Sequence, residues 1–478
     1  MKVPANLKNC LLALGVLQIS GACSTGDPAS RKQPNIIFIL ADDLGYSELG
    51  CYGNTFNETP RLDEMAAKGI RFTHAYASAP VCSPYRVSLM TGLYPARTGI
   101  TDYLRPNDSK ILDTSLVILP EALRTNGYHT GIIGKWHLSG YIAAGAPIEI
   151  LPDKRGFNEV MTSENRGIGE GTYFYPYHFN PDLEKILPGE KEYLVDRMNR
   201  EAVEFIERNH QKPFFLYISH YAVHTTLHGR PDIAEHFKQK PGSGQSSPST
   251  GNPDDDPYRK YPSGFRAPLN NPHLAAQLKS IDEGVGMIQD KLRELKIDGN
   301  TIVIFTSDNG GESRVTTNYP LRDGKSTLYE GGIREPLIIY QPGRISGGKI
   351  ISTPTANYDF LPTICDLTGT PYPATHTING VSIAPLLLSG KSTPIEEREF
   401  FWHYPLEARH FLGGRSAGAI RSGAWKLIEF FDTSEVELYN LDSDPEESEN
   451  MAASEPEIAT ELKGKLSVWR SEVLPESR

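Results

Sequence analysis

The stretch Asn35-Ile36-Ile37-Phe38-Ile39-Leu40-Ala41, which runs directly into Asp42-Asp43, decides the fold. Its apolar residues follow one another without alternating with polar ones, a pattern typical of a strand buried on both faces of a parallel sheet. In such sheets, ligands bind beyond the carboxyl ends of the strands. The sequence therefore predicts that Asp42 and Asp43 lie at a ligand-binding edge.

Three later segments repeat this pattern of a buried strand followed by polar residues. They are 129–134 before Lys135-Trp136-His137, 214–219 before His224, and 301–306 before Ser307-Asp308-Asn309-Gly310. Helices are expected between them, near 60–68, 114–126, 191–209 and 272–296. Alternating strands and helices predict an α/β fold: a large doubly wound, mixed but mostly parallel sheet flanked by helices.

The length of 478 residues suits a large domain followed by a smaller one. We expect the large domain at 33–395, with 239–262 as a long surface loop and 389–399 as the link to the rest. Residues 396–478 are expected to form a small C-terminal α+β domain. Its antiparallel sheet would use strands at 417–421, 426–431 and 437–440, followed by a helix near 455–473.

Residues 1–23 are typical of an export signal. Lys2 and Lys8 precede the apolar run 11–17, which is too short to span a bilayer. Small residues at 20–22 precede Cys23, so two routes are open: cleavage with release, or lipidation of Cys23 as in bacterial lipoproteins. No other run has the length and apolarity of a transmembrane helix. The expected location is the periplasm or the cell surface. If Cys23 is lipidated, the protein would be anchored as an outer-membrane lipoprotein.

The formal net charge of −11 argues against a nucleic-acid-binding surface, which needs a basic stripe. It does not argue against a small anionic substrate, because a few cationic side chains can still form a positive pocket. Beyond the signal segment, the cysteines are Cys51, Cys82 and Cys365. Three cysteines do not make a disulfide framework, and a Cys51–Cys365 bridge is left open.

Two acid-containing pairs, Asp42-Asp43 and Asp308-Asn309, follow buried strands. Oxygen ligands from two strand ends suit Ca²⁺, and Mg²⁺ less well. For either pair alone, ordinary turn chemistry explains the residues equally well. Together they favour a metal site.

Basic side chains follow the same strands. Lys135 and His137 are two residues apart and point the same way if the chain is extended, while His224 and Lys325 come from other segments. A lone histidine is more often structural than catalytic. Several cations facing two acid pairs predict instead an anion site beside a metal, with proton donors for a leaving group.

Cys82 precedes Pro84, a residue favoured in the first turn of a helix, and Arg86 follows one turn further on. Cys82 is therefore expected at a helix amino terminus, where the helix dipole favours an anion. Composition alone would favour a buried structural cysteine.

The segment Cys82-Ser83-Pro84-Tyr85-Arg86, followed by Ser88-Leu89-Met90-Thr91-Gly92, resembles the C-x-P-x-R signature of type I, formylglycine-dependent sulfatases of the alkaline phosphatase superfamily. The segment 134–137 is similar to the second signature of this family. Asp42-Asp43, Asp308-Asn309-Gly310 and the segment 324–334 match further family motifs in the same order. The resemblance runs from about Pro34 to the carboxyl end and includes bacterial arylsulfatases and N-acetylgalactosamine-type polysaccharide sulfatases.

This resemblance implies a mechanism for the hydrolysis of sulfate esters, with 33–395 as the catalytic domain. Cys82 would be converted to formylglycine (3-oxoalanine) by a formylglycine-generating or radical SAM maturation enzyme. The modified residue, Asp42, Asp43, Asp308 and Asn309 would hold one Ca²⁺. Further roles are implied for residues that stabilise the nucleophile (Arg86), accept its proton (Asp308), bind the sulfate group (Lys135, Lys325, His224), protonate the leaving oxygen (His224 or Lys325) and assist sulfate release (His137).

Two other functions are weighed against this one. The first is a phosphate or phosphonate ester hydrolase of the same superfamily, and the second is a non-catalytic glycan-binding lipoprotein. A phosphatase normally needs two metals and more ligands than the one site predicted here, whereas a purely binding protein would not need the unbroken motifs.

Export and the acidic surface favour a sulfated mono-, oligo- or polysaccharide as the partner. Aromatic and basic residues expected near the site are candidates for holding it: Arg166, Tyr173, His178, Trp402, His403 and Arg409. For Trp402 and Tyr404, packing between the two domains explains the residues equally well.

Overall fold

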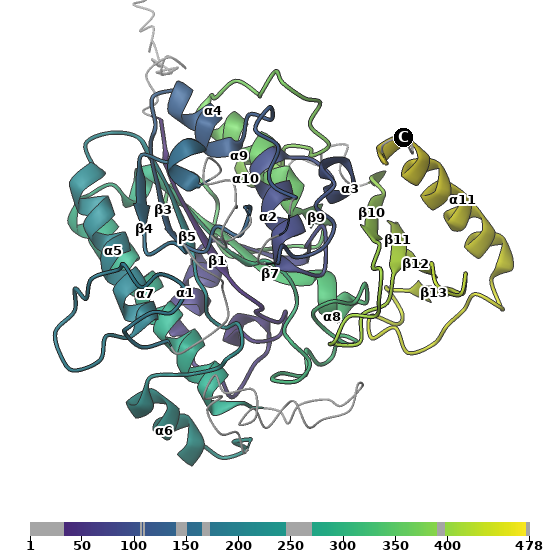
Figure 1. Cartoon of the computed structure of the whole chain (residues 1–478), viewed down its shortest axis with the longest axis horizontal. Helices are drawn as coiled ribbons and strands as arrows, with labels where there is room; N and C mark the ends of the chain where they lie inside the picture. The colour runs from purple at the N-terminus through teal and green to yellow at the C-terminus, as the bar shows by residue number, and fades with distance from the viewer. Residues whose placement is uncertain are drawn as a thin grey trace, which may run out of the picture. The chain divides into compact units, whose positions relative to one another are not determined.

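The segments that were expected to be buried strands lie side by side at the centre of one large sheet (Figure 1). The computed structural model describes residues 33–474 apart from 106–107, 109, 140–150, 165–172, 245–269 and 390–396. Nine strands pair in the order β4-β3-β5-β1-β6-β7-β2-β8, with β9 beside β2. Their bounds are β1 Asn35–Ala41, β2 Ile70–Tyr76, β3 His129–Gly134, β4 Glu159–Met161, β5 Phe214–Ser219, β6 Thr301–Ser307, β7 Arg334–Tyr340, β8 Lys349–Ile351 and β9 Thr355–Ala356.

The sheet is mixed and mostly parallel, as predicted. Strand β1 pairs in parallel with β5 and with β6, and β3 pairs in parallel with β5. Strand β7 is antiparallel to both β6 and β2. The four strands β3, β5, β1 and β6 therefore point the same way, and their carboxyl ends meet at one edge.

Both faces of β1 are buried, which explains its unbroken apolar run. Ile36 and Phe38 pack into the core on one face, whereas Ile37 and Ile39 pack into the core on the other. Helices α2 Cys82–Thr91, α4 Leu119–Thr125, α9 Phe360–Thr368 and α10 Ala384–Ser389 cover the first face. Helices α1 Pro60–Lys68, α5 Leu194–Asn209 and α7 Pro272–Glu294 cover the second (Figure 1). The remaining helices are α3 Pro95–Thr98, α6 Pro231–Gln239 and α8 Glu330–Ile333.

A second sheet, antiparallel and four-stranded, forms near the carboxyl end, as predicted. Its strands are β10 Phe400–Tyr404, β11 Ala417–Ser422, β12 Trp425–Phe430 and β13 Val436–Asn440, and α11 Pro456–Val473 follows. One face packs against α11, and the other packs against residues that flank α2 and α8. Both sheets belong to a single compact unit, Gln33–Arg478. The predicted boundary between a large domain at 33–395 and a small domain at 396–478 therefore stays a prediction.

Cys51 and Cys365 are free thiols. Cys51 packs with the core on one face of the large sheet, and Cys365 lies in the core on the other face. The sheet separates them, so they do not form the bridge that the sequence left open. No helix among the described residues is long and apolar enough to cross a bilayer. The signal segment, most of the 239–262 loop and most of the 389–399 link lie outside the described residues.

Candidate active site

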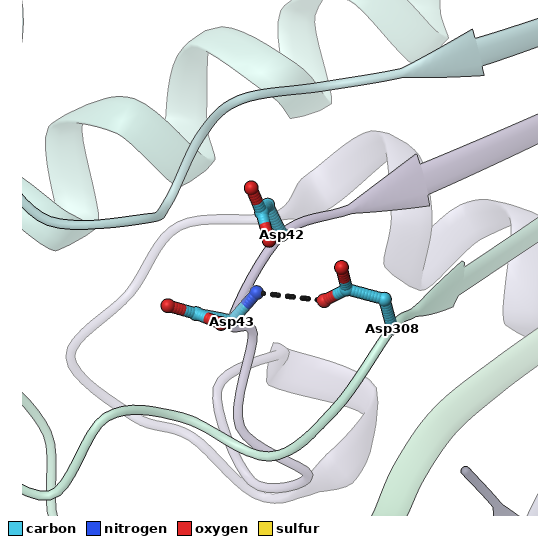
Figure 2. Close-up of side chains that lie close together, drawn as sticks. All are labelled: Asp42, Asp43 and Asp308. Atoms are coloured by element: carbon cyan, nitrogen blue, oxygen red, sulfur yellow. Dashed lines mark hydrogen bonds between the residues drawn. The ribbon is translucent and has the colours of Figure 1, made fainter. Parts of the chain in front are cut away.

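The ends of β1 and β6 bring three carboxylates together, as the sequence predicted (Figure 2). Each of Asp42, Asp43 and Asp308 offers an oxygen within 4.8 Å of the others. At most 2% of each residue is exposed. The backbone N–H of Asp43 donates to Asp308 Oδ1 at 3.1 Å, and Asn309 Nδ2 donates to Asp43 Oδ1 at 2.8 Å. These bonds fix the two strand ends relative to each other.

Three buried cations surround the carboxylates. Lys135 Nζ lies 2.6 Å from Asp42 Oδ2, and Lys325 Nζ lies 2.7 Å from Asp43 Oδ2. Arg86 Nη2 lies 2.7 Å from Asp308 Oδ2 and 3.8 Å from Asp42 Oδ1. Each cation comes from a different element: the end of β3, the loop before α8, and the second turn of α2.

The carboxylates respond to this environment in different ways. Burial, followed by the nearby Asp308, raises the pKa of Asp42 well above its usual value. Burial would also raise the pKa of Asp43, but Lys325, His224 and Lys135 overcome it and hold that pKa well below its usual value. Arg86 and Lys135 likewise lower the pKa of Asp308 against the effect of burial. Three carboxylates this close repel one another, and a bound cation would relieve that repulsion.

The donor set fits a hard divalent cation. Asp42 Oδ1 and Asn309 Oδ1 are buried and have no hydrogen-bond partner among the described residues. An amide oxygen and an ionised carboxylate oxygen only accept hydrogen bonds, so the carboxylate and carbonyl oxygens nearby cannot satisfy them. With the three carboxylates they form an all-oxygen group of the kind that binds Ca²⁺. We conclude that Asp42, Asp43, Asp308 and Asn309 can hold one such ion.

Cys82 is the first residue of α2, as predicted, and is 3% exposed. Its Sγ lies 3.1 Å from His137 Nδ1, and His137 Nε2 lies 2.9 Å from the carbonyl oxygen of Leu104. A carbonyl only accepts, so Nε2 carries the proton and donates it to Leu104. The lone pair of His137 Nδ1 therefore faces residue 82. Burial, and then Lys135, lower the pKa of His137 to about 3, which keeps the ring neutral.

Cys82 lies beside the carboxylate cluster, because its partner His137 follows Lys135 by two residues and Arg86 stands one turn further along the same helix. Arg86 is 0% exposed and also donates through Nη1 to the Lys135 carbonyl at 3.1 Å and to Ser219 Oγ at 2.5 Å. The arginine thus ties helix α2 to the ends of β3, β5 and β6.

His224, in the loop after β5, lies beside the same carboxylate cluster. Its Nε2 lies 3.6 Å from Asp43 Oδ2, and its Nδ1 lies 2.5 Å from the carbonyl of Thr225. Burial, and then Lys325, lower the pKa of His224 to about 3. All the predicted catalytic residues therefore converge on one edge of the sheet.

Glu164 is a site residue that the sequence reasoning missed. Its carboxylate accepts the backbone N–H of His137 at 2.6 Å, that of Trp136 at 2.9 Å, and the Tyr221 hydroxyl at 2.9 Å. His137 has a positive φ of 54°, a conformation that non-glycine residues rarely adopt. Glu164 holds this turn in place. It lies three residues beyond a short strand, without a motif that could have indicated it.

The predicted substrate-contacting residues do not all converge on the cluster. Arg166 lies outside the described residues. His178 is exposed, whereas Tyr173 is buried and donates to the carbonyls of Tyr221 and His224, so it supports the His224 loop. Arg409 lines a cavity of about 320 Å³ together with Arg322 and Arg415.

The residues of β10 divide between its two faces. Trp402 and Tyr404 face the large sheet, and Trp402 Nε1 donates to the Ala77 carbonyl at 2.7 Å. Trp402 therefore packs the two sheets together. His403 points the other way, toward Phe431 and Arg470, so the structure does not bring it to the carboxylate cluster.

Comparison with known proteins agrees with this geometry. Residues 34–370 match the family described as sulfatase, and residues 322–472 match the family described as N-sulphoglucosamine sulphohydrolase, C-terminal. Arylsulfatase A of Homo sapiens is 32% identical over 463 residues, which cover 91% of this chain and 82% of that protein. N-acetylgalactosamine-6-sulfatase of Canis lupus familiaris is 31% identical over 422 residues, covering 81% and 72%.

Among solved structures, the crystal structure of Ps i-CgsB in complex with k-i-k-neocarrahexaose superposes with a TM-score of 0.75 at 28% identity. The superposition covers 92% of this chain and 93% of that one. The family match spans the carboxylate cluster, Cys82 and the basic residues around them. The chain therefore belongs to the sulfatase family, within the alkaline phosphatase superfamily, and is a hydrolase of sulfuric esters.

Proposed function

We propose that this enzyme hydrolyses sulfate esters of carbohydrates, using a formylglycine made from Cys82 and one Ca²⁺. The observation that carries the proposal is the position of Cys82. It begins a helix, its Sγ lies 3.1 Å from Nδ1 of the neutral His137, and Arg86, one turn along the same helix, forms an ion pair with Asp308. A relative named for N-acetylgalactosamine 6-sulfate and a structural neighbour bound to an oligosaccharide support a carbohydrate substrate.

The proposed Ca²⁺ and formylglycine would supply positive charge and a nucleophile. When bound, Ca²⁺ offers a Lewis acid that stabilises anionic oxygens, and the hydrate of formylglycine offers an oxygen nucleophile in place of a thiol. The fixed residues prepare the surroundings. Arg86 keeps Asp308 ionised and in place through the 2.7 Å ion pair, and Asn309 holds Asp43 in place through a 2.8 Å hydrogen bond.

Lys135 and Lys325 are the residues placed to bind the sulfate group. Their ammonium groups lie on either side of the Asp42–Asp43 pair, and both are at least nine-tenths buried. In a dry site, such charges attract an anion far more strongly than they would in water. We infer that the sulfate oxygens lie between the two lysines.

Proton movement is assigned to two atoms, His137 Nδ1 and Lys325 Nζ. His137 Nδ1 faces residue 82 with its lone pair and is placed to take a proton from the group there. Asp308 was expected to accept this proton, but its two oxygens are engaged by Arg86 and by the N–H of Asp43. For the leaving oxygen we favour Lys325 over His224. Burial lowers the pKa of Lys325, but Asp43 raises it by more, so Lys325 carries a proton that it can donate. The N–H of His224 is on Nδ1 and is directed at the Thr225 carbonyl.

The decisive experiment replaces Cys82 with Ala and measures hydrolysis of 4-nitrophenyl sulfate. Activity should fall to background while the thermal midpoint stays close to that of the native enzyme. Intact mass of the native enzyme should be lower by the difference between CH₂SH and CHO. Full turnover by the Cys82→Ala variant would overturn the mechanism. An active enzyme with an unmodified thiol would overturn the formylglycine assignment alone.

The metal assignment has a separate test that does not depend on turnover. Chelator-treated enzyme should gain thermal stability on addition of Ca²⁺, and the Asp42→Asn variant should gain much less. Asp282→Asn, a change outside this site, serves as the control and should respond like the native enzyme. An equal response in all three proteins would place the ion elsewhere.

The phosphatase and phosphonate alternatives are separated by substrate. Among the described residues, a single group of three acids is arranged to hold a metal, whereas phosphatases normally need two metals. We expect 4-nitrophenyl sulfate to be hydrolysed faster than 4-nitrophenyl phosphate. The reverse order would favour the alternative. Glycan binding without turnover, in protein matured in its native host, would favour a non-catalytic lipoprotein.

We also propose export through residues 1–23, with lipidation at Cys23 as the anchoring route, on the sequence pattern alone. Metabolic labelling with palmitate tests it. Labelled protein that becomes unlabelled in a Cys23→Ala variant supports the lipid anchor, and unlabelled native protein contradicts it.

A further inference from the structure

The loop between β10 and β11 carries a buried hydrogen-bond donor that has no described partner. The side chain of His410 is 7% exposed in the folded chain, and its Nε2 has no hydrogen-bond partner among the described residues. The backbone N–H of Leu412 donates to His410 Nδ1 at 3.2 Å. Because Nδ1 accepts, the proton of the neutral ring sits on Nε2. A buried N–H without an acceptor is unfavourable unless a ligand accepts it.

His410 lies within the electrostatic field of the active site. Burial first, and then Lys325, Arg105 and Arg314, lower its pKa to about 4, so the ring is neutral near pH 7. The Tyr103 ring packs against His410, and the next residue, Leu104, accepts a hydrogen bond from His137 Nε2. The unpaired donor is therefore close to the residue 82 site.

Aromatic rings surround this donor. The Tyr103 ring meets His410 edge-on at a centroid distance of 5.7 Å, and the Phe411 ring lies 4.4 Å from it. Phe411 is 63% exposed. Its exposed ring face is free to contact an apolar face of a ligand. A pyranose ring offers both complementary features, an apolar C–H face for the aromatic ring and oxygens that can accept the N–H.

Two guanidinium groups flank the aromatic rings. Arg105 lies over the Tyr103 ring at 4.2 Å, and Arg314 lies over the Phe411 ring at 5.1 Å. Arg105 follows Leu104, whose carbonyl holds His137, so this segment borders the residue 82 site directly. Arg105 pairs with Asp102 at 2.8 Å and Arg314 pairs with Glu312 at 2.5 Å, and the remaining planar donors of each guanidinium suit a further carboxylate or sulfate oxygen.

We propose that Tyr103, His410 and Phe411 form a sugar subsite beside the sulfate site, where His410 Nε2–H donates to a sugar oxygen and Arg105 and Arg314 favour a second anionic substituent. This inference rests on the proposed carbohydrate sulfatase function and narrows its substrate class. The preferred substrate is a sulfated pyranose that carries another anionic group, a second sulfate or a uronate carboxylate. His410 is a specificity-determining residue in this proposal.

The test compares sugar and non-sugar substrates. The probes are 4-nitrophenyl sulfate and a panel of N-acetylhexosamine monosulfates, hexosamine disulfates and monosulfated disaccharides that contain a uronate. In His410→Ala, kcat/KM for the best sugar should fall about tenfold relative to kcat/KM for 4-nitrophenyl sulfate, as expected for one lost hydrogen bond. His410→Gln, which keeps a side-chain N–H, should restore most of this ratio. His236→Ala, an exposed histidine on α6, is the matched control and should leave the ratio unchanged.

Arg314→Gln tests the second anionic group. The preference for doubly anionic over singly anionic sugars should fall in this variant, and the panel shows whether sulfate or carboxylate is preferred. An unchanged sugar-to-aryl ratio in His410→Ala would overturn the subsite, as would turnover of 4-nitrophenyl sulfate with none of the sugars. Native enzyme that hydrolyses neither kind of sulfate would instead overturn the proposed function, so the two failures are distinguishable.

Discussion

Glu164 offers the sharpest test of how this site is positioned. Its carboxylate accepts two consecutive backbone N–H groups, from Trp136 and His137, in the turn that places Lys135 beside Asp42 and His137 beside Cys82. It also accepts the Tyr221 hydroxyl. Glu164 is 8% exposed, so water does not readily replace these bonds.

The magnitude follows from the donors left behind. Glu164→Ala would leave three buried donors without an acceptor at about 1–3 kcal/mol each, so we expect a loss of about 4 kcal/mol in the free energy of unfolding. The turn at His137 has a positive φ and would relax without this support. A displacement of about 1 Å in Lys135 and His137 should lower kcat by about 100-fold.

The assay separates positioning from general destabilisation. Glu164→Gln keeps an acceptor oxygen and should lose only about 1–2 kcal/mol and recover much of kcat. Glu159→Gln is the matched control because Glu159, on β4, pairs with Arg208 and His129 at 26% side-chain exposure, away from the turn. It should leave kcat near the native value. A well-folded Glu164→Ala enzyme with kcat within about threefold of native would refute the reasoning.

Three further predictions follow from buried charges. Burial raises the pKa of Asp282 to about 6 from its ordinary 3.8. The folded state therefore holds a proton that the unfolded state has released, and this contribution to stability is lost as pH rises through 6. The loss amounts to about 3 kcal/mol. Asp282→Asn keeps an oxygen that can accept the N–H groups of Arg61 and Leu62 but no longer titrates. The free energy of unfolding, measured with denaturant between pH 4 and 7, should therefore depend less on pH in this variant. An unchanged pH dependence would contradict the raised pKa of Asp282. Lys426 Nζ lies 2.9 Å from Glu330 and 2.8 Å from Glu447, so Lys426→Met leaves both carboxylates buried without a cation and should lower the free energy of unfolding by about 3–5 kcal/mol. The control is Lys463→Met, which removes an exposed partner of Glu429 and should lower it by less than about 1 kcal/mol. Equal losses in the two variants would count against the buried network. Arg86→Lys removes the planar fork that contacts Asp308 and Ser219. It should lower kcat for 4-nitrophenyl sulfate by about 100-fold and the free energy of unfolding by about 1–3 kcal/mol. Native kcat in this variant would show that the fork is dispensable.

The carboxylate cluster was predictable because a simple rule governs it. Asp42 and Asp308 directly follow apolar runs that only a doubly buried strand explains, and the carboxyl ends of parallel strands meet at one edge. The helix start at Cys82 was predictable for a similar local reason, since Pro84 favours a first turn.

The rest of the site depends on long-range packing that the local pattern does not encode. Strand β10 is almost entirely apolar and aromatic, with Trp402 and Tyr404 packed on one face and His403 on the other. With both faces covered, the sequence carried no alternation that could tell which residues point toward the catalytic residues. Glu164 and His410 lie in irregular segments, where neither a helical nor a strand period applies.

The loop before α8, together with the first residue of that helix, connects the small sheet to the carboxylate cluster. Toward the large sheet, this loop carries Lys325 to Asp43 at 2.7 Å. Toward the small sheet, Arg322 Nη1 donates to the Tyr439 hydroxyl at 2.9 Å and to the Glu447 carbonyl at 2.8 Å. Further along, Glu330 contacts buried Lys426 of β12. Because one short loop makes both sets of contacts, a shift of the small sheet should displace Lys325, the residue proposed to bind the sulfate group.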